Sequence, residues 1–391
     1  MKQKLQQSDR EYAKRYLKPR SSSRKNRKVF DGLGTTELSK YETINTLFGK
    51  PILPVPEYLD LSRDGFSEEL VIFITYLESL LSEYNHIYLS FKETKKVRLP
   101  MFLMLVAIQE KYNAKISVIW ASNKFNAVNK AIIEAGAFES ASKRRATLAD
   151  SEDIRIPVIS GSNEEFVDFP DILVDAIRDK FYDGDIPTKV EDKIAQAVTE
   201  TLENVGRHAY PDEKRDLNKK WWLICSVGHT DANATDRYMF LAIYDAGRGI
   251  PSSFSDSPVF QNRVKRHYPQ QYKTLIQGDD VARSKKHALT GIARTFGSYV
   301  LPFRNMIGDS GLIYASMMQD LTRLDDEDHG QGSKSIKDVI TNDADSLLLV
   351  FSNKGCYQYN KGHSEEHSRI EHSHELPGTM LQWSINLDEL D

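Results

Sequence analysis

Apolar residues in the second half of the chain recur with the period of an α-helix, and two strand-like runs follow. One stripe repeats every three or four residues, which places its members on a single helix face. The stripe consists of Val190, Ile194, Val198, Leu202 and Val205. The later runs 221–227 and 238–244 are apolar and short enough to be buried strands, and we expect them to pair with each other. The pattern therefore predicts a helix packed on a sheet.

The first half alternates between strand-like and helix-like patterns. Short apolar runs bounded by polar residues predict strands, and longer runs with a period of 3.6 residues predict helices. The expected elements are strands at 58–62, 87–91 and 115–120 and helices at 67–84, 100–112 and 124–136. This alternation is typical of a small α/β layer domain over 51–142. The polar, Ser-rich segment 143–165 is expected to be a linker, followed by a second domain over 166–391.

Composition agrees with two globular domains in a cytoplasmic protein. The chain has 391 residues, of which 40% are hydrophobic, enough for two buried cores. Its two cysteines, Cys225 and Cys356, lie in apolar runs and are expected to be reduced core residues. No apolar run approaches the roughly 18 residues of a membrane span, so we expect no association with a membrane.

Charge is distributed unevenly along the chain. The net charge is −4, yet residues 1–28 contain eleven Lys or Arg against Asp9 and Glu11. Such an arm, here taken as 1–50, is suited to contact nucleic acid; a solvated tail or a protein-docking segment is the alternative.

Polar residues opposite the apolar stripe form a candidate catalytic row. Glu200 and Asn204 lie four residues apart on that face, His208 continues the line, and Arg207 flanks it. A carboxylate can orient and deprotonate water, an amide oxygen can bind Mg²⁺, and an arginine can neutralise phosphate. A solvated polar face is the alternative interpretation of this row.

A glycine-rich turn follows the second predicted strand. The strand runs directly into Asp245, Gly247, Gly249 and Ile250, and the glycines allow a ligand to approach the backbone closely. Together with the Glu-x-x-x-Asn helix, this Asp-x-Gly-x-Gly-Ile turn resembles the first two signatures of the GHKL (Bergerat-fold, HATPase_c-like) ATPase superfamily. The resemblance implies that Asp245 accepts a hydrogen bond from the amino group of adenine.

Two further segments match later signatures of that superfamily. Gly330 and Gly332 open a predicted helix, where backbone N–H groups can bind phosphate, and Ser333 and Lys334 add side-chain donors. A competing turn at 291–297 has Pro302 inside the helix that would follow, which disfavours it. Near the C-terminus, a Pro-Gly-Thr turn ends at Thr379, which by resemblance would reach the adenine edge.

The resemblance implies a C-terminal α/β sandwich with a long helical ATP lid over 251–328. It predicts a Mg²⁺-dependent, slow ATPase whose lid closure controls a protein partner, with ATP and Mg²⁺ as cofactors. A serine/threonine kinase of the anti-sigma-factor type and a non-catalytic ATP-gated switch for protein or nucleic acid are the alternatives. The order of elements over 51–142 resembles a STAS-like domain, although the Asp-Ser-Ser-Gly acceptor turn of that family is missing. Homodimerisation is implied by resemblance alone.

Overall fold

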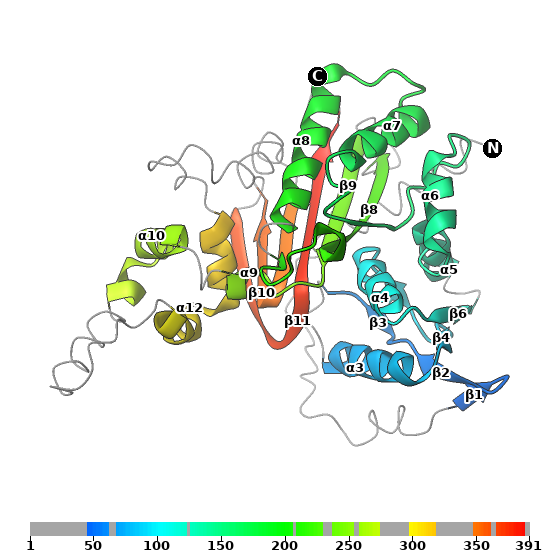
Figure 1. Ribbon diagram of the computed structural model, residues 1–391, viewed down its shortest axis with the longest axis horizontal. Coiled ribbons are helices and arrows are strands. Elements are labelled where there is room, and N and C mark those ends of the chain that lie inside the picture. Colours follow the sequence, from blue (N-terminus) through cyan, green and yellow to red (C-terminus); the bar gives the residue numbers. More distant parts are fainter. Residues whose placement is uncertain are drawn as a thin grey trace.

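The chain combines helices and sheets in a mixed α/β architecture (Figure 1). The computed structural model describes residues 45–61, 68–122, 126–205, 209–229, 237–253, 258–273, 297–317, 347–360 and 365–387. Within these residues the strands form a four-stranded, a five-stranded and a two-stranded sheet. The predicted α/β class is confirmed.

The N-terminal part is built on the four-stranded sheet, in the order β1-β2-β4-β6. Its strands are β1 (Asn45–Leu47), β2 (Lys50–Pro54), β4 (His86–Ser90) and β6 (Lys115–Ile119). β1 is antiparallel to β2, whereas β2, β4 and β6 run parallel. The helices of this part are α3 (Glu68–Glu83), α4 (Pro100–Lys111) and α5 (Asn126–Ala135), and β3 (Tyr58–Leu59) pairs with β5 (Lys96–Val97).

The C-terminal part is built on the five-stranded antiparallel sheet, in the order β10-β11-β9-β8-β7. Its strands are β7 (Ile159–Ser162), β8 (Lys220–His229), β9 (Arg237–Asp245), β10 (Leu347–Tyr359) and β11 (His367–Asn386). The predicted pairing of the two apolar runs is confirmed, because β8 and β9 are antiparallel neighbours.

Helices α7 (Phe169–Phe181) and α8 (Thr188–Asn204) share a buried core with one face of this sheet. The predicted stripe on α8 is confirmed: Val190, Ile194, Val198 and Leu202 are fully buried and Val205 is 5% exposed. Side chains alternate along each strand, so every second residue of β8 and β9 points away from these helices. The opposite sheet face is therefore also apolar and needs a cover.

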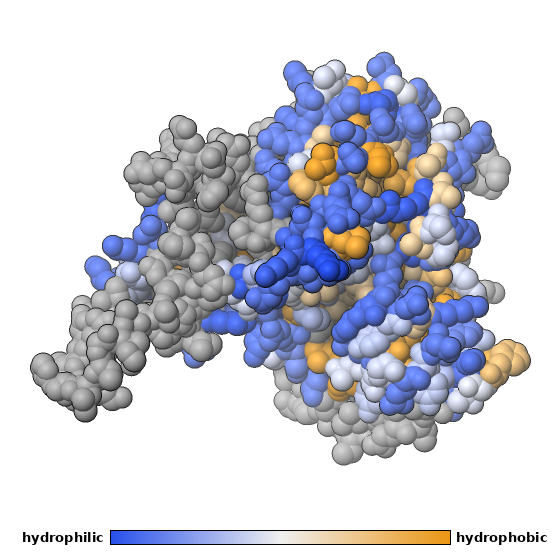
Figure 2. Space-filling model, in the orientation of Figure 1, coloured by the Kyte–Doolittle hydropathy of each residue, from blue (hydrophilic) through white to orange (hydrophobic). Residues whose placement is uncertain are grey.

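That cover is α4, a helix buried on all sides. Its first nine residues, Pro100 to Ile108, are all buried, and it contacts both β8 and β9. A helix that is apolar around its whole circumference is stable only inside a core. One hydrophobic cluster accordingly runs from Ile87 and Leu89 of the small sheet through α4 to Trp222 and Tyr244 of the large one. Outside these cores the visible surface of the described residues is mainly hydrophilic (Figure 2).

A polar anchor fixes the C-terminal end of α4. Glu110 accepts hydrogen bonds from Arg144 (Nη2, 2.6 Å), Ser160 (Oγ, 2.9 Å) and the indole of Trp222 (Nε1, 2.9 Å). The side chain of Arg144 is only 3% exposed, so its charge depends on Glu110 for a counter-ion. These bonds tie α4 to three other elements of the fold, α6, β7 and β8.

The segment predicted as a linker, 143–165, instead carries regular structure. α6 (Ala141–Ala149) begins after Ser140, whose hydroxyl accepts a hydrogen bond from the backbone N–H of Lys143, and β7 joins the large sheet. Its Ser and Gly content is typical of a linker, but Gly161 is needed for packing. A Cβ at this position would lie 2.2 Å from the ring of Trp221. The stretch predicted as a linker therefore contains most of a helix and a strand of the large sheet.

Two other segments differ from or sharpen the expectations. Residues 353–359 continue β10 beyond an irregularity at Asn353. Within the expected lid, the described elements are helical, namely α9 (Ile250–Ser253), α10 (Pro258–His267) and α12 (Gly297–Met317). The helix that Pro302 was expected to disfavour does form, because α12 contains Pro302, whereas residues 291–296 of the competing turn lie outside the described residues.

Among the described helices, none has the length and apolarity needed to cross a membrane.

Replacing Glu110 with alanine should lower the free energy of unfolding by roughly 2–4 kcal/mol. The change removes three hydrogen bonds and leaves the buried guanidinium of Arg144 without its counter-ion. Denaturant unfolding measures the effect. Glu78→Ala is the matched control, since it breaks the exposed pair with Lys111 and should cost less than about 1 kcal/mol. Equal losses in the two variants would contradict the anchoring role of Glu110.

Candidate functional site

The candidate site is centred on Asp245, the last residue of β9. Asp245 is 6% exposed and lies opposite Trp221 of β8 and Thr379 of β11. Its neighbour Tyr244 belongs to the core shared with α4, so strand alternation directs the carboxylate of Asp245 to the side of α7 and α8. The carboxylate thus lies at the end of the sheet, on its helix-covered face.

Burial shifts the ionisation of this carboxylate. Removal from water raises the pKa of Asp245 from its ordinary value of 3.8 to about 7, although backbone N–H groups of Gly247 and Thr379 donate to it and oppose the shift. The bond from Gly247 N to Asp245 Oδ1 is 2.9 Å long. Near neutral pH the group is therefore poised between its neutral and charged forms.

The chain just beyond α8 contacts the turn that follows Asp245. The backbone N–H of Arg248 donates to the carbonyl of Ala209 (2.9 Å), and the N–H of Ala246 donates to the hydroxyl of Tyr210 (3.0 Å). Burial, and then the charge of Asp245, raise the pKa of Tyr210, so the phenol stays protonated and donates to the carbonyl of Lys220 (2.8 Å). The segment that follows the predicted helix therefore meets the predicted turn.

Two glycines of the turns have no room for a side chain. Gly378 adopts φ +80°, and a Cβ there would lie 1.9 Å from the carbonyl oxygen of Asp245. Gly249 adopts φ +83°, and its Cβ would lie 2.4 Å from the side-chain oxygen of Asn353. Both require left-handed backbone and close approach, which only glycine combines. The predicted Pro-Gly-Thr turn is instead a bulge inside β11, and the structure brings it against the predicted Asp-x-Gly-x-Gly turn.

Ser352 joins these turns to β10. Its buried hydroxyl accepts from the backbone N–H of Ile250 (2.8 Å), donates to the carbonyl of Gly378 (3.1 Å) and lies 3.0 Å from the Thr379 hydroxyl. Sequence reasoning missed Ser352 and Tyr210. In the sequence, Ser352 is only a serine at the end of an apolar run, and Tyr210 is only a tyrosine just after the polar row. Their hydrogen-bond partners are distant in the sequence.

The catalytic row lies on the last turns of α8. Glu200 and Asn204 are both half-buried, and the side chain of Gln196 donates to Glu200 Oε1 (3.3 Å). On a fully solvated helix face both side chains would be exposed, whereas here they are half-buried. This carboxylate and this amide lie five to ten residues before Ala209 and Tyr210 in the sequence.

The remaining predicted site residues lie outside the described parts of the chain. These are Arg207, His208, Gly330, Gly332, Ser333 and Lys334. Within the described residues no three His, Cys, Asp or Glu side chains are grouped as a metal site. Asn204, the predicted Mg²⁺ ligand, is the last residue of α8.

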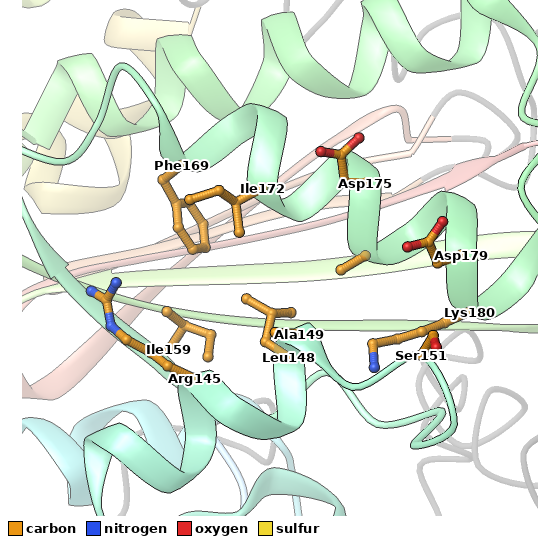
Figure 3. Close-up of a pocket in the computed structure, with 11 residues that line it drawn as sticks. Arg145, Leu148, Ala149, Ser151, Ile159, Phe169, Ile172, Asp175, Asp179 and Lys180 are labelled. Carbon is orange, nitrogen blue, oxygen red and sulfur yellow. The ribbon is translucent and has the colours of Figure 1, made fainter.

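A separate cavity of about 280 Å³ lies between α6, α7 and β7 (Figure 3). Its floor is apolar and its rim is charged, and the pKa of Lys180 at one end is lowered by burial. The ammonium of Lys180 donates to the carbonyls of Thr147, Asp150 and Asp153, so it holds the end of α6 against α7. None of the predicted site residues lines this cavity.

The raised pKa of Asp245 should make its effect on stability depend on pH. Between about pH 4 and 7 the folded protein retains a proton that the unfolded chain releases, so Asp245 lowers stability as the pH rises. Relative to wild type, Asp245→Asn should therefore gain about 2–4 kcal/mol of unfolding free energy between pH 4 and pH 8, in denaturant titrations. Asp216→Asn is the control, because Lys219 lowers the pKa of exposed Asp216 and no such gain is expected. A stability difference between Asp245→Asn and wild type that does not vary with pH would contradict the assignment.

The chain matches no protein-family model, no curated protein and no solved structure. The geometry of the site is therefore the basis for any statement about function.

Proposed function

We propose that this chain is a Mg²⁺-dependent ATP-binding protein of the GHKL type that hydrolyses ATP slowly, with the adenine bound at the Asp245 turn. One observation carries the proposal: a carboxylate is buried at the end of a central strand, beside a turn and a strand bulge that both require glycine. Buried carboxylates normally have a cationic partner. None of the described residues supplies a positive charge to Asp245. A neutral donor from a ligand fits this position.

The adenine amino group is such a donor. It would donate to the oxygen of Asp245 that Gly247 leaves free, while the hydroxyl of Thr379 lies on the adjacent strand. Gly249 and Gly378 let the backbone pack closely around Asp245, which fixes the position of this carboxylate. Asp245 would thus select adenine over bases that carry a carbonyl at the same position.

Glu200 and Asn204 suit the chemical step. Asn204 would hold Mg²⁺ through its amide oxygen, and the ion would neutralise phosphate charge. Glu200 would orient and deprotonate the attacking water. Their half-buried position on α8 supports this role, since the helix leads into the segment that contacts the Asp245 turn. Arg207, His208 and the Gly330–Lys334 turn would complete the phosphate site.

Control of a partner is supported by the packing of the N-terminal part. Tyr244 lies in the core shared with α4, and its hydroxyl donates to the carbonyl of Pro377 (3.0 Å), next to Gly378. A ligand that shifts either turn would therefore act on residues that contact the N-terminal part. The ATP-gated switch is the second candidate function for this reason, with or without turnover.

Wild-type protein should bind ATP at least about tenfold more tightly than ITP, in which a carbonyl replaces the amino group. The preference comes from the hydrogen bond to ionised Asp245, and a bond to a charged group contributes roughly 1.5–3 kcal/mol. It should fade below about pH 7, because protonated Asp245 is a poorer acceptor. Isothermal titration calorimetry at pH 6 and pH 8 measures both effects.

Asp245→Asn provides the control for that experiment. It should lose both the ATP preference and its pH dependence, whereas any pH dependence that the two proteins share belongs to the phosphates. Equal affinity of the wild type for ATP and ITP at pH 8 would refute the adenine site.

Glu200→Gln should bind ATP with near wild-type affinity and hydrolyse it at least about a hundredfold more slowly, since a general base contributes roughly 10²–10⁴-fold. Phosphate release from labelled ATP measures turnover, and label appearing on protein would indicate kinase activity instead. The matched control is Glu203→Gln, one position before Asn204 on the same helix. If Glu200→Gln turns over ATP as fast as wild type does, Glu200 is not the base.

A further inference from the structure

The small N-terminal sheet has one buried face and one open face. Ile87 and Leu89 of β4 are fully buried, and Leu53 and Ile116 on the flanking strands are 3% exposed. Figure 1 shows α3 and α4 on the side of this sheet that faces the large sheet. The alternate residues of β2 and β4 are half-exposed, and on β6 Lys115 is exposed. The described helices thus leave the outer face uncovered.

Strand register arranges the outer face in rows. Lys50 of β2, His86 of β4 and Lys115 of β6 form one row, because Ile52 pairs with Tyr88 and His86 pairs with Lys115. The pKa of His86 is lowered by burial and then by the charges of Lys115 and Lys50, which agrees with their closeness. This row is cationic at its two ends.

The next row places an aromatic ring at the centre of the face. It contains Ile52, Tyr88 and Ser117. The rings of Tyr88 and His86 lie 5.4 Å apart at an angle of 32°, and Ser117 Oγ lies 2.9 Å from His86 Nε2. No Asp or Glu occupies an outward strand position on this face.

A second aromatic ring extends from the hairpin beside Lys50. Phe48 and Gly49 form the two-residue turn between β1 and β2, with φ of +51° and +73°. Left-handed backbone is unfavourable for phenylalanine, and this side chain is 86% exposed, so no packing offsets the strain. A residue that is both strained and exposed indicates a contact made with something outside the chain.

We propose that this outer face, with Phe48 at its edge, binds single-stranded nucleic acid. Lysines attract the phosphates, and flat rings on an open sheet stack against unpaired bases. The absence of carboxylates among the outward strand positions favours a polyanion over a protein partner of mixed charge. The sugar is not distinguished by these contacts, so RNA and DNA strands are both candidates. This face shares only Phe48, Gly49 and Lys50 with the predicted arm 1–50, and it lies on a different sheet from the Asp245 turn.

Fluorescence anisotropy with labelled 12-nucleotide oligo(U) and oligo(dT) tests the proposal on the full chain. Tyr88→Ala should weaken binding roughly tenfold, and Tyr88→Phe should retain it, because the ring and not the hydroxyl stacks. Lys50→Ala with Lys115→Ala should reduce the slope of log affinity against log salt by about 0.7 per lysine. A duplex of the same length should bind more weakly than either strand, and the stronger of the two single strands identifies the sugar.

The control removes two lysines elsewhere. Lys111→Ala with Lys143→Ala deletes the same charge from exposed positions on α4 and α6 and should change binding less than twofold. Thermal melting shows whether each variant is folded. Ultraviolet cross-linking should place the strand on peptides that contain Phe48 or Tyr88. Wild-type affinity in both Tyr88→Ala and the Lys50/Lys115 double variant would overturn the proposal, as would no binding by the wild type at low salt.

Discussion

The burial of α4 between two sheets is the constraint on which the rest of the structure depends. The helix is apolar around its whole circumference, with residues 101–106 completely inaccessible to solvent. Burying a large aliphatic side chain contributes roughly 1.5–3 kcal/mol, so such a helix cannot remain with one face in water. The large sheet has the complementary need, because its strands alternate between two apolar faces and α7 and α8 cover only one of them. The two parts of the chain therefore complete each other's cores.

This packing determines what surrounds the candidate site. Because α4 covers one face of β9, a ligand can contact that strand only on the face toward α7 and α8 and at its last residue, Asp245. Glu110 contributes the polar part of the same constraint, since its carboxylate joins α4 to α6, β7 and β8 by side-chain bonds alone. The position of the N-terminal part is then set by both shape and hydrogen bonding, and its sheet is left with one free face.

Much of the fold could be predicted from local pattern, and much of the site could not. The stripe on α8 and the pairing of β8 with β9 follow from the spacing of apolar residues, which is visible within each segment alone. That α4 is buried also follows from its composition, but its second partner does not, because no sequence pattern says which sheet will cover it. The segment with α6 and β7 was missed because Gly161 and its serines serve the packing of Trp221 and hydrogen bonding, not a turn. In the site, the resemblance predicts Asp245, Gly249 and Thr379. Ser352 instead makes hydrogen bonds to residues 26 to 102 positions away in the sequence. Tyr210 makes hydrogen bonds to residues 10 and 36 positions away.

Consecutive residues of β9 link the two surfaces of this chain. Asp245 receives the N–H of Gly247 on the helix side, and Tyr244 donates to Pro377 beside the core of α4. Gly378 approaches the backbone of Asp245 so closely that a Cβ there would lie 1.9 Å from the Asp245 carbonyl oxygen. A close-packed interior transmits a displacement, so a shift of the Asp245 turn would displace Tyr244, which packs against the N-terminal part. The same helix that closes the core is thus the route by which the proposed nucleotide site and the open sheet face would influence each other.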